Sequence, residues 1–250
     1  MQKFRADLHI HTLLSPCADL EMTPKNIVDL SLKKGLQIIG ITDHNSTKNA
    51  LLVKKIASEK GLYVLTGAEV TTREEVHCLV FFDVKEQLQE FQKYIDQNSS
   101  RIPNPDGHFG YQPVIDENEN ITELISYYLP AALKKSIHEI QNKVYELEGI
   151  FIPAHIDRPA NGLLSQLGFI PENLEFDALG VLKHSSVTYV QKHRNRKVNI
   201  SFLTNSDAHH LSQIGEICSV LNMKEINFRE IKMALNQVDG RFVETNENNL

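Results

Sequence analysis

Short apolar runs alternate along most of the chain with segments whose apolar residues recur every three or four positions. The short runs are rich in branched side chains and predict strands, whereas the spaced segments predict helices. We expect strands at 4–10, 36–41, 62–65, 76–82, 150–154, 179–182 and 200–204, and helices at 24–35, 47–60, 85–97, 130–148 and 228–238. This order predicts an α/β fold with a largely parallel sheet. The number of strands that alternate with helices favours a closed or nearly closed barrel over an open doubly wound sheet.

The stretch at about 98–120 interrupts this alternation. It contains Pro103, Pro105, Gly107 and Gly110, which break regular structure. Two short apolar pieces, 114–115 and 121, flank an acidic turn and predict a small hairpin. We therefore expect one domain over residues 1–250 with an insertion at about 98–120, and long irregular segments of this kind often act as lids over active sites.

Composition limits the class of protein. The 250 residues are 41% hydrophobic and 23% charged, as in ordinary globular proteins. A net charge of −6 disfavours general binding to nucleic acid, although a local basic patch stays open. The three cysteines form no CxxC pair, which indicates a reducing compartment. No apolar run reaches the roughly 18 residues of a membrane span and no signal peptide is visible, so we expect a cytoplasmic protein without a membrane partner.

Histidine is the residue type in excess, with 11 copies, and it gathers with carboxylates where the predicted strands end. His9 and His11 are two residues apart on one strand, so both side chains project from the same face. Any one of these residues has an ordinary explanation, such as a helix cap or a surface ion pair. Together they predict a site that binds Zn, Mn or Fe, because barrel enzymes build their sites at the carboxyl ends of the strands. The candidates are His9, His11, His44, Glu69, His77, His155, Asp207 and His209.

These residues occur in motifs that resemble the polymerase and histidinol phosphatase (PHP) family. The matching segments are Asp7-Leu8-His9-Ile10-His11-Thr12, Thr42-Asp43-His44, Glu69 followed by His77, His155 within 153–159, and Asn205-Ser206-Asp207-Ala208-His209. They span residues 7 to 209. The resemblance implies a distorted (β/α)7 barrel of the PHP type that holds two or three divalent metal ions.

The resemblance also implies how the ligands are shared. One ion would be held by His9, His11, Glu69 and Asp207, a second by Asp19, His44 and His209, and a third by Glu69 as a bridge with His77 and His155. The family usually places the acid of the second set directly after a serine. Here Pro16-Cys17-Ala18 separates Ser15 from Asp19, so Cys17 and Glu21 are alternatives to Asp19.

The expected activity is hydrolysis of a phosphate ester by a hydroxide that bridges the ions. We expect Asp207 and His209 to take part in catalysis, and Arg158 either binds the phosphate oxygens or is an ordinary surface residue. A small phosphorylated substrate is favoured over nucleic acid, and the oligomeric state is open. Two rival hypotheses are an amidohydrolase and a metal-binding regulatory module without catalysis. The Asp43-His44 pair and the position of His209 favour the phosphoesterase.

Overall fold

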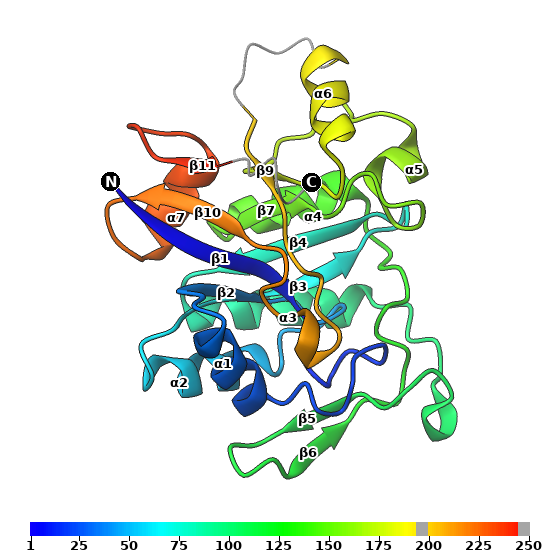
Figure 1. Cartoon of the computed structure of the whole chain (residues 1–250). Coiled ribbons are helices and arrows are strands. Elements are labelled where there is room, and N and C mark those ends of the chain that lie inside the picture. The colour runs from blue at the N-terminus through cyan, green and yellow to red at the C-terminus, as the bar shows by residue number, and fades with distance from the viewer. Residues whose placement is uncertain (194–199, 245–250) are drawn as a thin grey trace.

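The computed structural model describes residues 1–193 and 200–244, and its centre is a strongly curved mixed sheet (Figure 1). Seven strands form this sheet in the order β11-β10-β1-β2-β3-β4-β7. Their bounds are β11 Phe242–Glu244, β10 Ser219–Met223, β1 Gln2–Ile10, β2 Ile38–Ile41, β3 Tyr63–Thr71, β4 His77–Phe82 and β7 Ile150–Pro153. Two further pairs are β5 (Pro113–Ile115) with β6 (Ile121–Leu124), and β8 (Leu179–Gly180) with β9 (Phe202–Leu203).

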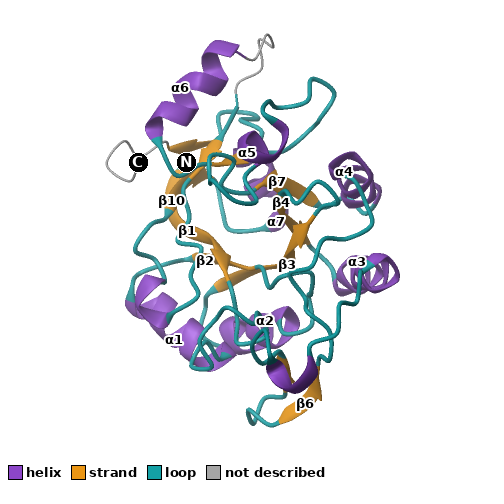
Figure 2. Cartoon of the chain, turned by 90° about the vertical axis from the view of Figure 1, so that its right-hand side faces the viewer, coloured by secondary structure: helices purple, strands orange, loops and turns teal. Residues whose placement is uncertain are grey.

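The β8-β9 pair lies between β7 and β1 and closes the curved sheet into a ring, which Figure 2 shows along the barrel axis. On one side, the Ile156 amide donates to the Gly180 carbonyl at 2.9 Å. On the other side, the Ala208 amide donates to the His9 carbonyl at 3.2 Å, and the His11 amide donates to the Ala208 carbonyl at 3.0 Å. The ring therefore runs β1-β2-β3-β4-β7-β8-β9, which confirms the expected distorted PHP-type barrel.

Strand direction corrects one expectation, because the main sheet is not largely parallel. Only the β1–β2 and β2–β3 pairs are parallel, whereas β4 is antiparallel to both of its neighbours. The link between β3 and β4 covers residues 72–76, and a parallel connection needs about a dozen residues or more. The reversal has a functional consequence, since it places His77, the first residue of β4, opposite Thr71, the last residue of β3.

Helices cover the outside of the barrel (Figure 2). Helix α1 begins as expected, with the Thr23 side chain accepting from the Asn26 amide and Pro24 in the first turn. Within the described part of the chain, no helix has both the length and the apolar character needed to span a bilayer. The bounds are α1 Pro24–Lys33, α2 Ala50–Ser58, α3 Lys85–Asn98, α4 Ile137–Glu146, α5 Leu163–Leu167, α6 His184–His193 and α7 Phe228–Leu235, with short 3-10 turns η1 Pro105–Gly107 and η2 Leu211–Gln213.

The barrel interior and the helix contacts form separate apolar clusters. Leu8, Ile38, Leu65, Leu79 and Ile152 come from five different strands and pack together as one buried cluster. Other clusters join β3, β4 and β7 to α3 and α4, and β1 and β2 to α1 and α2. Burial of these apolar surfaces holds the strand ends in fixed positions, and the polar site is built on those ends.

Helix α4 begins at Ile137, seven residues later than the pattern predicted. Ser136 stops the helix from extending towards the N-terminus, because its side chain accepts from the Glu139 amide while the Ser136 amide donates to the Glu139 carboxylate. The preceding residues bond to the barrel instead, and the Leu133 amide donates to the Thr71 carbonyl at 2.9 Å. Tertiary hydrogen bonds thus override the helical spacing at 130–136.

Candidate metal centre

The chemistry-bearing side chains meet at one end of the barrel. His9 and His11 end β1, Glu69 lies in the last part of β3, and His77 begins the antiparallel strand β4. His44 follows β2, His155 follows β7, and Asp207 and His209 follow β9. The structure brings these eight residues together, as the strand-end pattern indicated.

Glu69 lies at the centre of the group and is buried with 1% exposure. Its Oε1 atom is 2.9 Å from His77 Nδ1, 3.0 Å from His155 Nε2 and 3.3 Å from His9 Nε2. Its Oε2 atom is 3.3 Å from His11 Nε2 and 3.2 Å from His44 Nδ1. One carboxylate therefore contacts five imidazoles, an arrangement suited to a ligand that bridges neighbouring ions.

Three sets of side chains place one ligand atom each within 4.8 Å of one another. The first set, His9, His11, Glu69 and Asp207, matches the ligands expected for the first ion. The other two sets are His11 with His44 and His209, and His44 with Glu69 and His77. His155 joins the cluster through its hydrogen-bonding contact with Glu69.

The donor atoms are arranged for binding divalent cations and are incompletely satisfied by hydrogen bonds to one another. His9 Nε2 and His11 Nε2 face each other at 3.1 Å, and Asp207 Oδ1 lies 3.2 Å from the first and 3.3 Å from the second. Asp207 Oδ1, His44 Nδ1 and His155 Nδ1 are buried, and none has a partner in hydrogen-bonding geometry among the described residues. Orphaned buried polar atoms are costly, and nitrogen and carboxylate oxygen atoms converging in this way are the donors that Zn, Mn and Fe accept.

The electrostatics of the cluster separate its histidines into two kinds. Burial lowers the pKa of His11, but Asp207 and Glu69 outweigh burial and raise that pKa to about 10. Burial, and then the positive charge of His11, lower the pKa of His209 to about 4 and also lower the pKa of His44. The lowered pKa values favour the neutral form of His44 and His209, which is the form that binds a metal ion, whereas the raised pKa of His11 favours its protonated form.

Three residues of the site turn the chain with a left-handed backbone. Asn45, His155 and Asp207 have φ angles of 43°, 27° and 51°. Each such residue costs about 1–3 kcal/mol unless the surroundings impose it, and such strain gathers at functional sites. Gly180 makes room for one of these turns, because a Cβ atom on it would lie 2.8 Å from the His155 amide nitrogen.

Asp19 does not join the cluster in the described structure. Its Oδ2 atom is 2.6 Å from His210 Nδ1, its side chain is 53% exposed, and its amide donates to the His209 carbonyl. His11 takes the place expected for Asp19 beside His44 and His209. Arg158 does reach the site, because its guanidinium donates to Asp207 Oδ2 at 3.0 Å while its side chain stays 43% exposed.

Asp7 begins the first of the sequence motifs, but it is not among the candidate ligands that the sequence predicts. It is fully buried, and its carboxylate accepts from the Ser206 amide at 3.1 Å, the Ser206 hydroxyl at 2.6 Å and the Gly215 amide at 3.0 Å. These bonds hold the turn that carries Asp207. Its position two residues before His9 on the same strand was the available clue.

The insertion lies beside the site and is anchored to it. The Asn45 side chain donates to the carbonyls of Leu129 and Ala131, which follow the insertion and precede α4, at 2.7 and 2.9 Å. The Asn49 side chain donates to the Pro113 carbonyl and accepts from the Ile115 amide, both at 3.3 Å. Both asparagines are buried, so the base of the predicted lid is fixed to the barrel, and β5 and β6 form the expected hairpin.

The chain is similar to a known domain family and to a relative that matches it over nearly its whole length. The family model described as the PHP domain matches residues 7–159. The uncharacterized protein YqxK of Bacillus subtilis is 28% identical over 98% of the chain. The chain covers 65% of YqxK, so it spans less than two thirds of this relative.

Two solved structures share the fold. The lesion-specific endonuclease PfuEndoQ of Pyrococcus furiosus has a TM-score of 0.74 and 21% identity, covering 97% of this chain and 58% of its own. A proposed metal-dependent phosphoesterase of Bifidobacterium adolescentis has a TM-score of 0.61 and 18% identity, covering 93% of this chain and 96% of its own. The family match and the clustered His, Glu and Asp donors support a metal-dependent hydrolase. The chain belongs to the PHP domain family.

Proposed function

We propose that the chain is a phosphoesterase that hydrolyses a small phosphate ester with the help of two or three bound Zn, Mn or Fe ions. The observation that supports this most is the carboxylate of Glu69, which contacts five imidazoles and can serve adjacent ions. Ions at this site supply activation of water and neutralisation of phosphate charge. The three free cysteines are consistent with the reducing cytoplasm as its location.

Individual residues have distinct roles in this proposal. His9, His11, Glu69 and Asp207 would hold the first ion, and His44, His77, His155 and His209 would complete the remaining sites, with Asp19 as a further candidate. The Asp207 carbonyl can only accept, so His209 Nδ1, 2.7 Å away, donates to it and keeps Nε2 available for a ligand.

In this proposal Arg158 binds the substrate phosphate. It contacts Asp207 Oδ2, while Oδ1 of the same carboxylate faces His9 and His11. Because Arg158 contacts a candidate metal ligand, its guanidinium could donate two hydrogen bonds to phosphate oxygens next to the ions. These bonds would orient the ester for in-line attack. Its partial exposure leaves it accessible to substrate.

The test is hydrolysis of a phosphate monoester and a phosphodiester by protein loaded with Mn or Zn. We expect turnover of at least one ester, and we expect Asp207→Ala to abolish it. Asp29→Ala, which removes a surface carboxylate paired with Lys60, is the matched control and should keep full activity. Metal binding without turnover of either ester would favour the non-catalytic module, and hydrolysis of amides alone would favour the amidohydrolase.

A nucleic-acid substrate is the second candidate. It is favoured by the fold shared with Endonuclease Q, whose structure has been solved in complex with a 27-mer duplex carrying an abasic lesion. The net charge of −6 opposes it, since phosphate-backbone binding is driven by basic surfaces. Turnover of oligonucleotides that falls steeply with added salt would select this candidate over a small ester.

A further inference from the structure

Ser15 is next to two of the candidate metal ligands but is not itself one of them. It has no solvent exposure, and its Oγ atom is 2.9 Å from His11 Nδ1 and 2.8 Å from Asp43 Oδ1. The same oxygen accepts a hydrogen bond from the His44 amide at 3.2 Å. One buried hydroxyl therefore contacts two candidate metal ligands and one buried carboxylate.

The direction of the Ser15 hydrogen bond follows from the partners of Asp43. The Thr12 amide donates to Asp43 Oδ1 at 2.7 Å. The Thr12 hydroxyl already accepts from the Leu14 amide and the Asn49 side chain, so its own hydrogen goes to Asp43 Oδ2 at 2.7 Å. Asp43 is thus an acceptor at both oxygens, and the Ser15 hydrogen points to Asp43 as well.

This direction determines the tautomer of His11. A hydroxyl has one hydrogen to donate and two lone pairs to accept with. Because Ser15 donates to Asp43, its lone pairs receive the His44 amide and His11 Nδ1. His11 Nδ1 therefore carries a hydrogen, and Nε2 is the atom that faces His9, Glu69 and Asp207 as a metal ligand.

We propose that Ser15 and Asp43 are positioning residues that fix the orientation and tautomer of His11, and the backbone position of His44, for metal binding. The inference rests on the proposed metal centre but not on its substrate. Groups that orient a metal-binding histidine through its second nitrogen typically contribute a factor of about 10–100 to metal affinity. Here the carboxylate acts through a serine hydroxyl and not on the imidazole itself.

The first measurement is the Nδ1–H proton of His11, followed by NMR in protein with ¹⁵N-labelled histidine. We expect this proton to exchange slowly with solvent in the wild type, with and without Zn²⁺, and to lose its protection in Ser15→Ala. Ser31→Ala is the matched control, since Ser31 is also fully buried but its hydroxyl has no hydrogen-bond partner in the part of the chain that the structure describes. Thermal unfolding of each variant verifies that it is folded.

The second measurement is Zn²⁺ affinity by competition with a chromophoric chelator. We expect Ser15→Ala to weaken binding by about 10–100-fold, Asp43→Asn to weaken it less because the serine contact persists, and Ser31→Ala to leave it unchanged. Wild-type affinity and a protected Nδ1–H proton in folded Ser15→Ala would overturn the proposal. A wild type that binds Zn²⁺ but hydrolyses no ester would overturn only the proposed function.

Discussion

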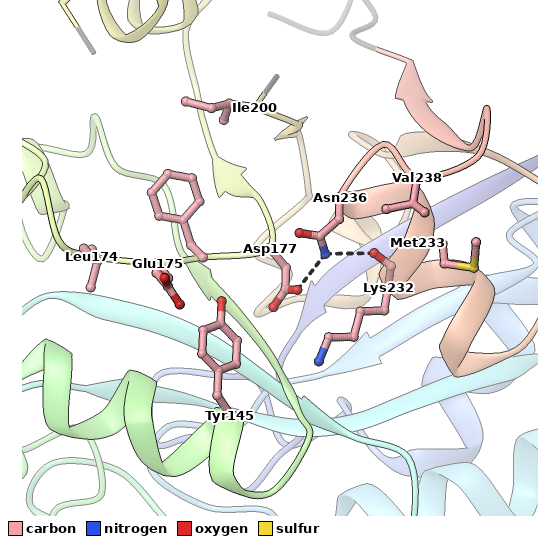
Figure 3. A pocket seen from close by; sticks show the side chains of 10 residues that line it. Tyr145, Leu174, Glu175, Asp177, Ile200, Lys232, Met233, Asn236 and Val238 are labelled. Atoms are coloured by element: carbon pink, nitrogen blue, oxygen red, sulfur yellow. Dashed lines mark hydrogen bonds between the residues drawn. The ribbon is translucent and has the colours of Figure 1, made fainter. Parts of the chain in front are cut away.

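The two ends of the barrel differ in what they offer a ligand. At the end where β1, β3 and β9 finish, the cavity bordered by His9, His155 and Asp207 has a volume of only about 10 Å³. At the opposite end, residues that precede β7, β8 and β9 line a cavity of about 560 Å³ together with α7 (Figure 3). The small cavity is bordered by two of the orphaned atoms, His155 Nδ1 and Asp207 Oδ1, whereas Asp177, Lys232 and Asn236 at the large cavity have hydrogen-bond partners.

Asp177 illustrates how the polar groups of the large cavity are satisfied. Its carboxylate accepts from the Phe151 amide at 2.8 Å and from the Asn236 side chain at 2.7 Å, as Figure 3 shows in part. Lys232 donates to the carbonyls of Glu148 and Gly149. The comparison teaches that unsatisfied nitrogen and oxygen atoms, and not cavity size, indicate the end of this barrel that is suited to metal ions.

Replacing the central carboxylate should give the largest effect. Glu69→Gln keeps the shape of the side chain but removes the charge shared by five imidazoles, so we expect loss of bound metal and a decrease in ester turnover of about 10²–10³-fold or more. Metal content and turnover measure the two effects. Glu175→Gln, which changes a carboxylate at the large cavity, is the matched control, and a similar loss there would break the distinction between the ends.

Removing the buried acid at the opposite end should affect stability alone. Asp177→Ala leaves the Phe151 amide and the Asn236 side chain without their acceptor, and an unsatisfied buried group costs about 1–3 kcal/mol. For a chain of this size each kcal/mol lowers the unfolding temperature by roughly 2–4 °C. Calorimetry measures the shift, and turnover below the unfolding temperature should stay at the wild-type level. Reduced turnover in the folded variant would mean that the two ends are coupled.

The sequence could predict the parts of the site that are encoded by neighbouring residues. His9 and His11 lie on one face because they are two residues apart in a strand, and His155 was found because it follows an apolar run directly. These features depend on spacing, which the sequence carries explicitly. The direction of β4 did not follow from spacing, because the expected strands 62–65 and 76–82 are separated by ten residues, close to the length of a parallel crossover. The observed β3 runs on to Thr71 and leaves only five residues.

Other features depend on contacts between distant segments. Asp19 is not part of the described cluster, and its carboxylate contacts His210, 191 positions further along the chain. The role of Ser15 requires His11, Asp43 and His44 to meet, and the late start of α4 requires the carbonyl of Thr71. Local periodicity contains no information about such partners, so these features emerged only in three dimensions.

The pH dependence of stability can test the environment of Asp177. Burial raises the pKa of this carboxyl above 3.8, so the folded state holds its proton to higher pH than the unfolded state. The resulting stabilisation is complete below pH 3.8 and is lost as pH rises through the folded pKa. Asp177→Asn should remove this dependence. The free energy of unfolding of both proteins is measured across the acid range. We expect the difference between the two proteins to change only between pH 3.8 and the pKa of Asp177 in the folded state. A difference that is the same at every pH would contradict the raised pKa of this carboxyl.

Lys232 should give the smallest effect and so defines the lower limit of the comparison. Its ammonium binds the carbonyls that follow α4 and lies 5.7 Å from the centre of the Tyr145 ring. Lys232→Met keeps an unbranched side chain that is one atom shorter and removes the charge, and interactions of this kind contribute about 0.3–1 kcal/mol. We expect a decrease in unfolding free energy within that range, with metal content and turnover unchanged. If Lys232→Met lowered turnover as strongly as Glu69→Gln, the large cavity would have to contribute to the reaction. The hydrogen bonds of its polar groups would then not indicate a purely structural role.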